Sequence, residues 1–325
     1  MKYHFVINPK AGNGKKTQEL SEQITKVCDE LGVNYNVYLT KAPLDATEYV
    51  RQAALDTSET HRFYACGGDG TLCELINGAP NNDNVEFGLI PIGTGNDFRR
   101  NFDNKEMFFD IERQINGKSA KIDLLKCNGR YCVNIVNIGF DCNVVYEMDK
   151  IRNVKIIPNK LAYVAGIVVT LFKKMYSKMK ITAEGIPEID RELLLIAIAN
   201  GRFYGGGFKA VPFASLHDGM IDISIIEKVS RLTFISLVGK YKEGTHLKTK
   251  NGQKCITYLR SNSLKLEFEK PIKICIDGEV ETAVGLDIEI APSATSFIIP
   301  DGVKELDNDA AFSEDTRVIN CSSLI

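Results

Sequence analysis

The first 121 residues alternate short apolar runs with helical patterns, and this alternation restricts the fold more than any other feature of the chain. Four runs are typical of buried strands: residues 5–7, 33–39, 62–66 and 87–92. Between them, apolar side chains recur every three or four residues, which is the period of an amphipathic helix. One such series is Leu20, Ile24, Val27 and Leu31. The order βαβαβαβ predicts an α/β domain, residues 1–121, with a doubly wound, mostly parallel sheet.

Strand-length segments dominate after residue 121, and few helical ones interrupt them. This pattern favours a second, mainly antiparallel domain, which we expect to be a β-sandwich over residues 122–292. Residues 293–306 are a segment that can return to the first domain. The polar, acidic end of the chain, residues 307–325, is expected to be a flexible tail. The length of 325 residues fits two domains.

The composition excludes several classes of protein. Forty Lys and Arg residues against 42 Asp and Glu residues leave a net charge of −2, so no overall positive field exists to hold nucleic acid. The longest uncharged apolar stretch, residues 161–172, is too short to be a transmembrane segment. The nine cysteines include no C-x-x-C pair, so we expect buried, reduced thiols rather than a disulfide or zinc framework.

One helical insertion is strongly basic. Residues 147–180 hold eight basic and two acidic residues, a net charge of +6, and the apolar run 161–172 lies inside it. Such a segment is typical of an element at the surface of an anionic membrane. A helix packed on the second domain, with its lysines in solvent, would have the same pattern, and the sequence does not decide between the two.

Three glycine-rich segments fall at the ends of the predicted strands: residues 8–15 (NPKAGNGK), 67–71 (GGDGT) and 91–98 (PIGTGNDF). Glycines at a strand-to-helix turn let backbone N–H groups approach phosphate oxygens. None of the three is a P-loop, because Lys16 stands where that motif needs Ser or Thr. One such turn is most often only a turn, but three at successive strand ends favour a nucleotide site.

Asp69 stands between two glycines of the second segment, directly after an apolar strand. A carboxylate beside phosphates repels them unless a divalent cation lies between, so a nucleotide at this position implies Mg²⁺. The alternative is that Asp69 only caps the helix that begins near Thr71.

Together these segments resemble the diacylglycerol kinase catalytic family, in particular its bacterial lipid kinase branch. The likeness continues through residues 137–141 (NIGFD), 200–208 (NGRFYGGGF), 216–222 (LHDGMID) and 277–279 (DGE), and covers about residues 1–302. NAD kinases and phosphofructokinases have similar GGDGT loops, but the whole series is specific to this family.

The resemblance implies ATP as the phosphoryl donor. By similarity the nucleotide would contact Asn8, Pro9, Lys10, Ala11, Gly12, Thr40, Gly68, Asp69, Gly70, Thr71, Leu72, Cys73, Glu74 and Thr94. Asp69 and Asp97 would face the nucleotide and its metal. Glu279 would accept the proton of the lipid hydroxyl, with Asp277 beside it.

The resemblance also implies a structural Mg²⁺ site. Asp218 would bind the ion with its carboxylate, Ser215 and Met220 with backbone carbonyls, and Asp123 would support it through water. From the residues alone, 216–222 is more readily a turn that leads into a strand, and 277–279 is also typical of a type I′ hairpin turn.

These inferences combine into a cytoplasmic, ATP- and Mg²⁺-dependent lipid kinase of phospholipid biosynthesis, peripherally associated with the membrane, that converts diacylglycerol to phosphatidic acid. One alternative is an NAD kinase-like enzyme, against which the first loop and residues 277–279 argue. The other is a non-catalytic nucleotide- or lipid-binding module, which would be expected to lack Asp69 or Glu279. The sequence does not decide between diacylglycerol, phosphatidylglycerol and a sphingoid base as acceptor, nor between a monomer and a homodimer.

Overall fold

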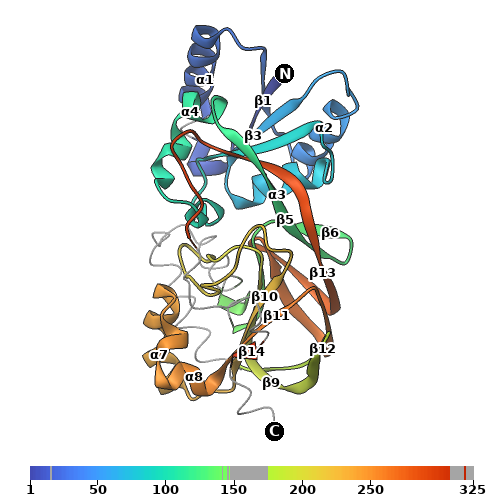
Figure 1. The fold of residues 1–325 in the computed structure, drawn as a ribbon, viewed down its shortest axis with the longest axis vertical. Helices are drawn as coiled ribbons and strands as arrows, with labels where there is room; N and C mark the ends of the chain where they lie inside the picture. The colour runs from blue at the N-terminus through green and yellow to red at the C-terminus, as the bar shows by residue number, and fades with distance from the viewer. Residues whose placement is uncertain (15–16, 141, 145, 147–174, 308–317, 320–325) are drawn as a thin grey trace. The chain divides into compact units, whose positions relative to one another are not determined.

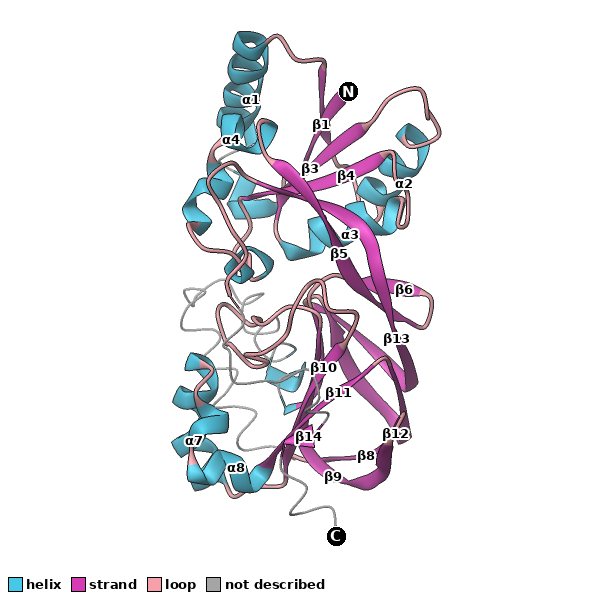
Figure 2. Ribbon diagram, viewed as in Figure 1, coloured by secondary structure: helices cyan, strands magenta, loops and turns pink. Residues whose placement is uncertain are grey.

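The computed structural model describes residues 1–14, 17–140, 142–144, 146, 175–307 and 318–319. They fall into two compact units (Figure 1). The first holds Met1–Leu124, Leu216–Gly219 and Ala291–Asp307, and the second holds the described parts of Leu125–Ser215, Met220–Ile290 and Asn308–Ile325. As expected, strands and helices both build the first unit, whereas strands dominate the second (Figure 2).

A parallel sheet forms the centre of the first unit. Its strands are β1 (Lys2–Ile7), β2 (Tyr35–Leu39), β3 (His61–Gly67), β4 (Val85–Pro91) and the end of β13 (Glu279–Ile299). They lie in the order β2-β1-β3-β4-β13, and every neighbouring pair is parallel. The carboxyl ends of β1 to β4 therefore lie at one edge of the sheet, where the glycine-rich segments begin.

Helices pack against this sheet. They are η1 (Ala11–Gly14), α1 (Thr17–Leu31), α2 (Asp45–Ala53), α3 (Asp69–Gly78), η2 (Phe98–Asn101), η3 (Lys105–Phe109) and α4 (Ile111–Ile115). In α1 the buried side chains are Leu20, Ile24 and Cys28, whereas Leu31, expected on the same face, is exposed because the helix ends there. Leu20, Ile24 and Cys28 share a core cluster with side chains of β1, β3 and α4.

The second unit is built on antiparallel strands. They are the end of β5 (Lys118–Cys127), β6 (Arg130–Cys132), β7 (Ile135–Gly139), β8 (Ser177–Ala183), β9 (Ile186–Ala199), β10 (Ile221–Glu227), β11 (Ile256–Ser261), β12 (Ser263–Ile276), the first part of β13, and β14 (Val318–Ile319). The order β14-β11-β10-β9-β7-β12-β13 is antiparallel throughout, and β8 joins β9 to β12. The helices α7 (Arg231–Glu243), η4 (His246–Lys248) and α8 (Lys250–Cys255) follow β10.

Two later segments of the chain, Leu216–Gly219 and Ala291–Asp307, belong to the first unit, and one buried side chain binds both. The carboxylate of Asp123 accepts hydrogen bonds from the backbone N–H of Gly219 and of Ser293, both at 2.7 Å. The strand pattern expected residues 122–292 to form one continuous domain and did not predict that Leu216–Gly219 would join the first unit. A carboxylate that binds two distant backbone amides does not change the spacing of apolar residues, so the hydrophobic pattern could not reveal this contact.

Much of the basic insertion lies outside the described residues, as do the apolar run 161–172, Lys15, Lys16 and most of the tail 307–325. Two of its lysines are described, and for them the helical expectation is wrong. Lys178 and Lys180 lie on strand β8, where Lys178 pairs with Glu269 at 2.6 Å and Lys180 with Glu188 at 3.2 Å. No helix among the described residues has both the length and the apolar character needed to cross a membrane.

Candidate functional site

A pocket lies at the carboxyl ends of β1 and β2. Its volume is about 130 Å³, and its walls are Asn8, Pro9, Lys10, Thr40, Lys41, Ala42, Pro43, Thr71 and Glu74. Six of these nine residues are predicted ATP contacts. Lys41, Ala42 and Pro43 were not predicted, although they directly follow Thr40 at the end of β2. Position at a strand end was the signal that could have included them.

Asn8 connects the first loop to the second. Its side-chain oxygen accepts a hydrogen bond from the backbone N–H of Lys10 at 3.0 Å, and its amide nitrogen donates to the Thr71 hydroxyl at 3.3 Å. A side chain at Gly67 would place its Cβ 2.2 Å from that hydroxyl oxygen, so no other residue fits there. Hydrogen bonds therefore connect the pocket wall from Asn8 to α3.

The third loop lies against the other two. The backbone N–H of Gly93 donates to the Gly67 carbonyl at 2.9 Å, and a Cβ on Gly93 would lie 2.6 Å from the Cα of Gly68. A Cβ on Gly12, where φ is +59°, would lie 2.7 Å from the Ile92 carbonyl oxygen. These glycines thus serve close packing between loops. Thr94, at the exposed part of the third loop, does not line the pocket.

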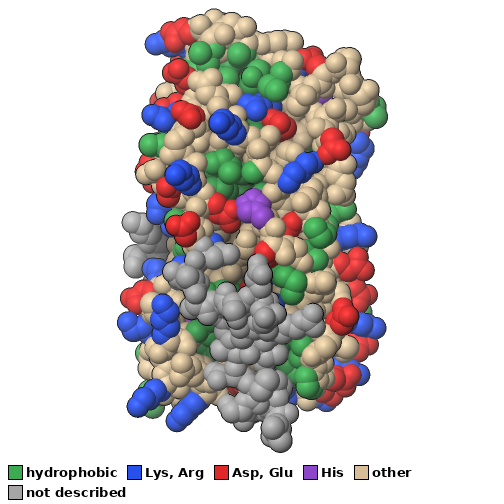
Figure 3. All heavy atoms as spheres, viewed as in Figure 1, with side chains coloured by type: hydrophobic (Ala, Val, Ile, Leu, Met, Phe, Trp, Pro, Cys, Tyr) green, Lys and Arg blue, Asp and Glu red, His purple; other side chains and the backbone are tan. Residues whose placement is uncertain are grey.

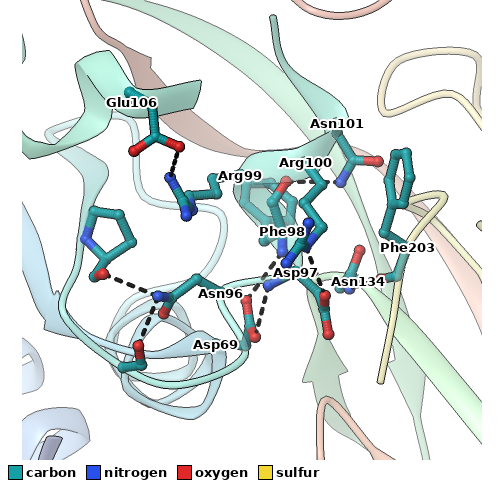
Figure 4. Close-up of polar contacts among 12 residues, drawn as sticks. Asp69, Asn96, Asp97, Phe98, Arg99, Arg100, Asn101, Glu106, Asn134 and Phe203 are labelled. Atoms are coloured by element: carbon teal, nitrogen blue, oxygen red, sulfur yellow. Dashed lines mark hydrogen bonds and ion pairs between the residues drawn. The ribbon is translucent and has the colours of Figure 1, made fainter. Parts of the chain in front are cut away.

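The carboxylate of Asp69 binds the third loop. Its two oxygens accept hydrogen bonds from the backbone N–H of Asp97 at 2.9 Å and of Phe98 at 3.0 Å (Figure 4). Helix α3 begins at Asp69, and these two bonds connect its first residue to the start of η2.

Asp97 and Asn96 complete this loop. An oxygen of the buried Asp97 pairs with the Arg100 guanidinium at 3.0 Å, while the amide of Asn96 donates to the carbonyls of Pro91 and Gly93 (Figure 4). Asn96 has a φ of +51°, which its short polar side chain tolerates. Two further predicted ATP contacts, Leu72 and Cys73, have buried side chains on α3, so only their backbone could contact a nucleotide.

Asp277 lies in the second unit, at the turn between β12 and β13. Asp277 and Gly278 have φ values of +46° and +91°, as the hairpin alternative required. The carboxylate is buried and accepts hydrogen bonds from three successive backbone amides, those of Val133, Asn134 and Ile135, at 2.7 to 3.1 Å. Asp277 therefore anchors the turn to the segment before β7.

Glu279 is the first residue of β13, and its side chain is about half exposed. It forms an ion pair with Arg130 of β6, whose guanidinium also lies 4.0 Å from Glu281. The sequence pattern did not point to Arg130. No motif marks it, because the β5–β6 hairpin alone brings it to the start of β13. Asp69 and Asp97 belong to the first unit, and Asp277 and Glu279 to the second.

The residues of the expected structural metal site lie around one turn. Asp218 is exposed within it, Ser215 and Met220 flank it in the chain, and Asp123 binds its Gly219 amide. Carboxylate and carbonyl oxygens are the donors that Mg²⁺ prefers, so this set fits the ion. Among the described residues no three His, Cys, Asp or Glu side chains gather to hold a metal. Any cation here would depend on backbone carbonyls and water as well.

His217 stands in the same turn and ties it to two other segments. One ring nitrogen lies 2.7 Å from the Lys121 carbonyl oxygen, and the other pairs with Glu305. The hydrogen bond with Glu305 raises the pKa of His217 above its ordinary value.

Comparison with known proteins shows the family. Residues 2–127 match the diacylglycerol kinase catalytic domain, and residues 134–299 match the YegS C-terminal NAD kinase beta sandwich-like domain. The chain belongs to the diacylglycerol kinase family, a family of phosphotransferases, as its motifs predicted.

The sequence matches to individual relatives cover most of the chain. It is 28% identical over 278 residues to a diacylglycerol kinase of Bacillus subtilis (strain 168), which covers 85% of this chain and 88% of the relative. A candidate lipid kinase of Staphylococcus haemolyticus (strain JCSC1435) is 27% identical, over 86% and 89% of the two chains. The crystal structure of a candidate diacylglycerol kinase from Bacillus anthracis str. Sterne has a TM-score of 0.71 at 23% identity, covers 92% and 97% of the two chains, and supports the two-domain fold.

Proposed function

We propose that this protein is an ATP-dependent lipid kinase that transfers the γ-phosphoryl group of ATP to the hydroxyl of diacylglycerol, giving phosphatidic acid. One observation carries the proposal: six residues that the family pattern assigns to ATP line a single pocket at the carboxyl ends of parallel strands. Nucleotides bind at this edge of open α/β sheets. Lys10 and Lys41 add positive charge at its wall, which suits a triphosphate.

In the proposed reaction, the oxygen of the lipid hydroxyl bonds to the γ-phosphorus, the bond to ADP breaks, and the hydroxyl proton passes to the carboxylate of Glu279. Asp69 and Asp97 would hold the metal, and Mg²⁺, when bound, would neutralise charge on the phosphate oxygens. Asp277 fixes the turn before Glu279 through the amides of residues 133–135. Arg130 orients the Glu279 carboxylate through their ion pair.

The second unit also holds a small apolar cavity, which has room for no more than a methyl or methylene group or two. It measures about 30 Å³, and all its walls are aliphatic or aromatic: Phe140, Val144, Leu194, Leu195, Phe208, Ile226, Val229, Phe234, Leu237, Val238, Tyr241 and Ile256. A cavity with such walls favours methylene and methyl groups over water.

Finer features of the family belong to the same proposal. We expect a doubly wound arrangement of the first unit, a β-sandwich in the second unit, a structural Mg²⁺ held by Asp218, Ser215 and Met220, and a peripheral position at the cytoplasmic membrane surface. The alternative of an NAD kinase has less support, because residues 2–127 match the diacylglycerol kinase catalytic domain.

The test is a phosphoryl transfer assay with labelled ATP and Mg²⁺. The acceptors are diacylglycerol, phosphatidylglycerol and sphingosine in detergent micelles, and NAD in solution. We expect labelled phosphatidic acid, and an identically purified Asp69→Asn variant excludes a contaminating kinase. Labelled NADP would instead support the NAD kinase. Tight ATP binding with no labelled product would support a non-catalytic module.

A further inference from the structure

Helix α7 has two apolar faces, of which only one serves the core. Phe234, Leu237, Val238 and Tyr241 point inward and line the apolar cavity. On the opposite face Leu232 is 81% exposed and Ile235 is 56% exposed. Single exposed aliphatic side chains are common. Two on neighbouring turns of a helix that is already packed by its other side contribute nothing to the core.

The segment that contains this aliphatic pair is strongly basic. Residues 228–254 hold seven basic residues and one acidic residue, Glu243, a net charge of +6. All seven basic side chains are exposed: Lys228, Arg231, Lys240, Lys242, Lys248, Lys250 and Lys254. In Figure 3 blue side chains gather at the lower left, over the position that Figure 1 gives to α7 and α8. Helical spacing places Arg231, Ile235 and Lys242 on one side of α7.

Several of these charges are available to a partner. Lys228 pairs with Glu192 and Lys240 with Glu243. The ion pairs among the described residues include none for Lys248, Lys250 or Lys254. This contrasts with Lys178 and Lys180 of the basic insertion, which face acidic side chains on neighbouring strands.

We propose that the exposed residues of α7 and α8, Leu232 and Ile235 with the basic residues around them, form a surface that docks on an anionic lipid bilayer. The charge and the type of the exposed side chains indicate an anionic bilayer as the partner. Aliphatic side chains enter the acyl boundary, and flanking lysines and arginines bind phosphate headgroups. The inference rests on the proposed lipid substrate, because an enzyme that takes its acceptor from a membrane must meet that membrane.

The experiment measures co-sedimentation of the full-length protein with vesicles of equal parts phosphatidylcholine and phosphatidylglycerol. A double variant, Leu232→Ser with Ile235→Ser, removes the aliphatic pair. A triple variant, Lys248→Gln with Lys250→Gln and Lys254→Gln, removes three charges. We expect each to weaken binding by about tenfold or more at low salt. High salt should abolish the difference for the triple variant only.

Matched control variants remove the same types of side chain at other exposed positions. Leu55 and Val284 are 72% and 67% exposed, and their double change to Ser should leave vesicle binding unchanged. The exposed lysines Lys105, Lys118 and Lys126, changed together to Gln, should also have little effect. Unchanged binding of either α7–α8 variant, or equal losses in the controls, would overturn the proposal. So would loss of a dimer in light scattering without loss of vesicle binding, because the surface would then join two copies.

A second readout separates this inference from the proposed function. Phosphorylation of a short-chain, water-soluble diacylglycerol needs no vesicle, so both α7–α8 variants should retain it at the wild-type rate. If the wild-type protein phosphorylates no lipid at all, the proposed function is wrong. If it does, and the variants still bind vesicles normally, only the docking surface is wrong.

Discussion

The carboxylate of Asp69 accepts a hydrogen bond from the backbone N–H of Asp97 at 2.9 Å, across 28 residues of sequence. The second oxygen accepts from the next amide, that of Phe98. Two glycine-rich loops are thus joined by a side chain that is also proposed to bind the metal of the nucleotide. Loss of this carboxylate should affect both stability and nucleotide binding.

Asp69→Ala should lower the free energy of unfolding by about 1–2 kcal/mol, because two backbone amides at the start of η2 lose their acceptor. It should also abolish measurable Mg²⁺-ATP binding. Urea unfolding and isothermal titration calorimetry measure the two effects.

Asp110→Ala is the matched control, because Asp110 caps α4 through the Arg113 amide at 3.1 Å and does not line the pocket. It should lose stability and keep full nucleotide affinity. Normal affinity in Asp69→Ala would remove Asp69 from the proposed metal site.

Glu279→Gln should reduce kcat at least about a hundredfold, since the amide keeps the shape of the side chain but cannot accept a proton. The affinities for ATP and lipid should change little. Steady-state kinetics with a soluble diacylglycerol and ATP titration provide the measurements.

Glu281→Gln is the control for Glu279, because Glu281 also lies near Arg130 but has no assigned role. It should retain kcat within about threefold. A fall of less than tenfold in Glu279→Gln would move the proton acceptor elsewhere, and loss of ATP binding would place Glu279 at the metal.

The alternation of strands and helices was predictable because buried parallel strands and amphipathic helices have different hydrophobic periods. The place of the pocket was predictable for a second reason: the glycine-rich segments with Asn8 and Thr71 follow strand ends that a parallel sheet brings to one edge, whereas Thr40 was assigned by the family resemblance alone. Residue position relative to a strand end is a local property of the sequence.

Side-chain partners that join distant segments were not predictable. Asp123 binds amides of residues 219 and 293, and Asp277 binds the amides of residues 133–135. The local sequence around either carboxylate does not reveal which distant amides it binds. Arg130 could not be assigned to Glu279 for the same reason, because only the tertiary structure brings the two side chains together.

Asp123→Asn should destabilise the first unit by about 1–2 kcal/mol, because the side-chain amide can accept for only one of the two partly buried N–H groups. Asp218→Asn, at an exposed position, should change the Tm little in EDTA. It should remove the rise in Tm that Mg²⁺ gives the wild-type protein, since an ion bound only by the folded state stabilises it. Differential scanning calorimetry with and without Mg²⁺ tests both variants. An equal Mg²⁺-dependent rise in Asp218→Asn and wild type would contradict the structural metal site.

Two buried histidines should make the protein sensitive to acid. Burial lowers the pKa of His4 to about 4, with a smaller contribution from His61, and lowers the pKa of His246 to about 4. Both are near 6.5 in an unfolded chain. Above pH 6.5 neither state is protonated and the stability is complete. As the pH falls from 6.5 towards 4, the unfolded chain takes up protons that the folded protein does not, so stability is lost.

Each histidine should cost about 2–3 kcal/mol of stability by pH 4.5. Carboxylates also titrate at low pH, so the informative quantity is the difference between wild type and His246→Leu in urea unfolding from pH 8 to pH 4.5. The variant lacks one of the two groups, and its stability should therefore fall less steeply below pH 6.5. Between pH 7 and pH 8 the two curves should run parallel, because both histidines are then neutral in both states. Parallel curves over the whole range would mean that His246 becomes protonated in the folded protein as readily as in the unfolded chain.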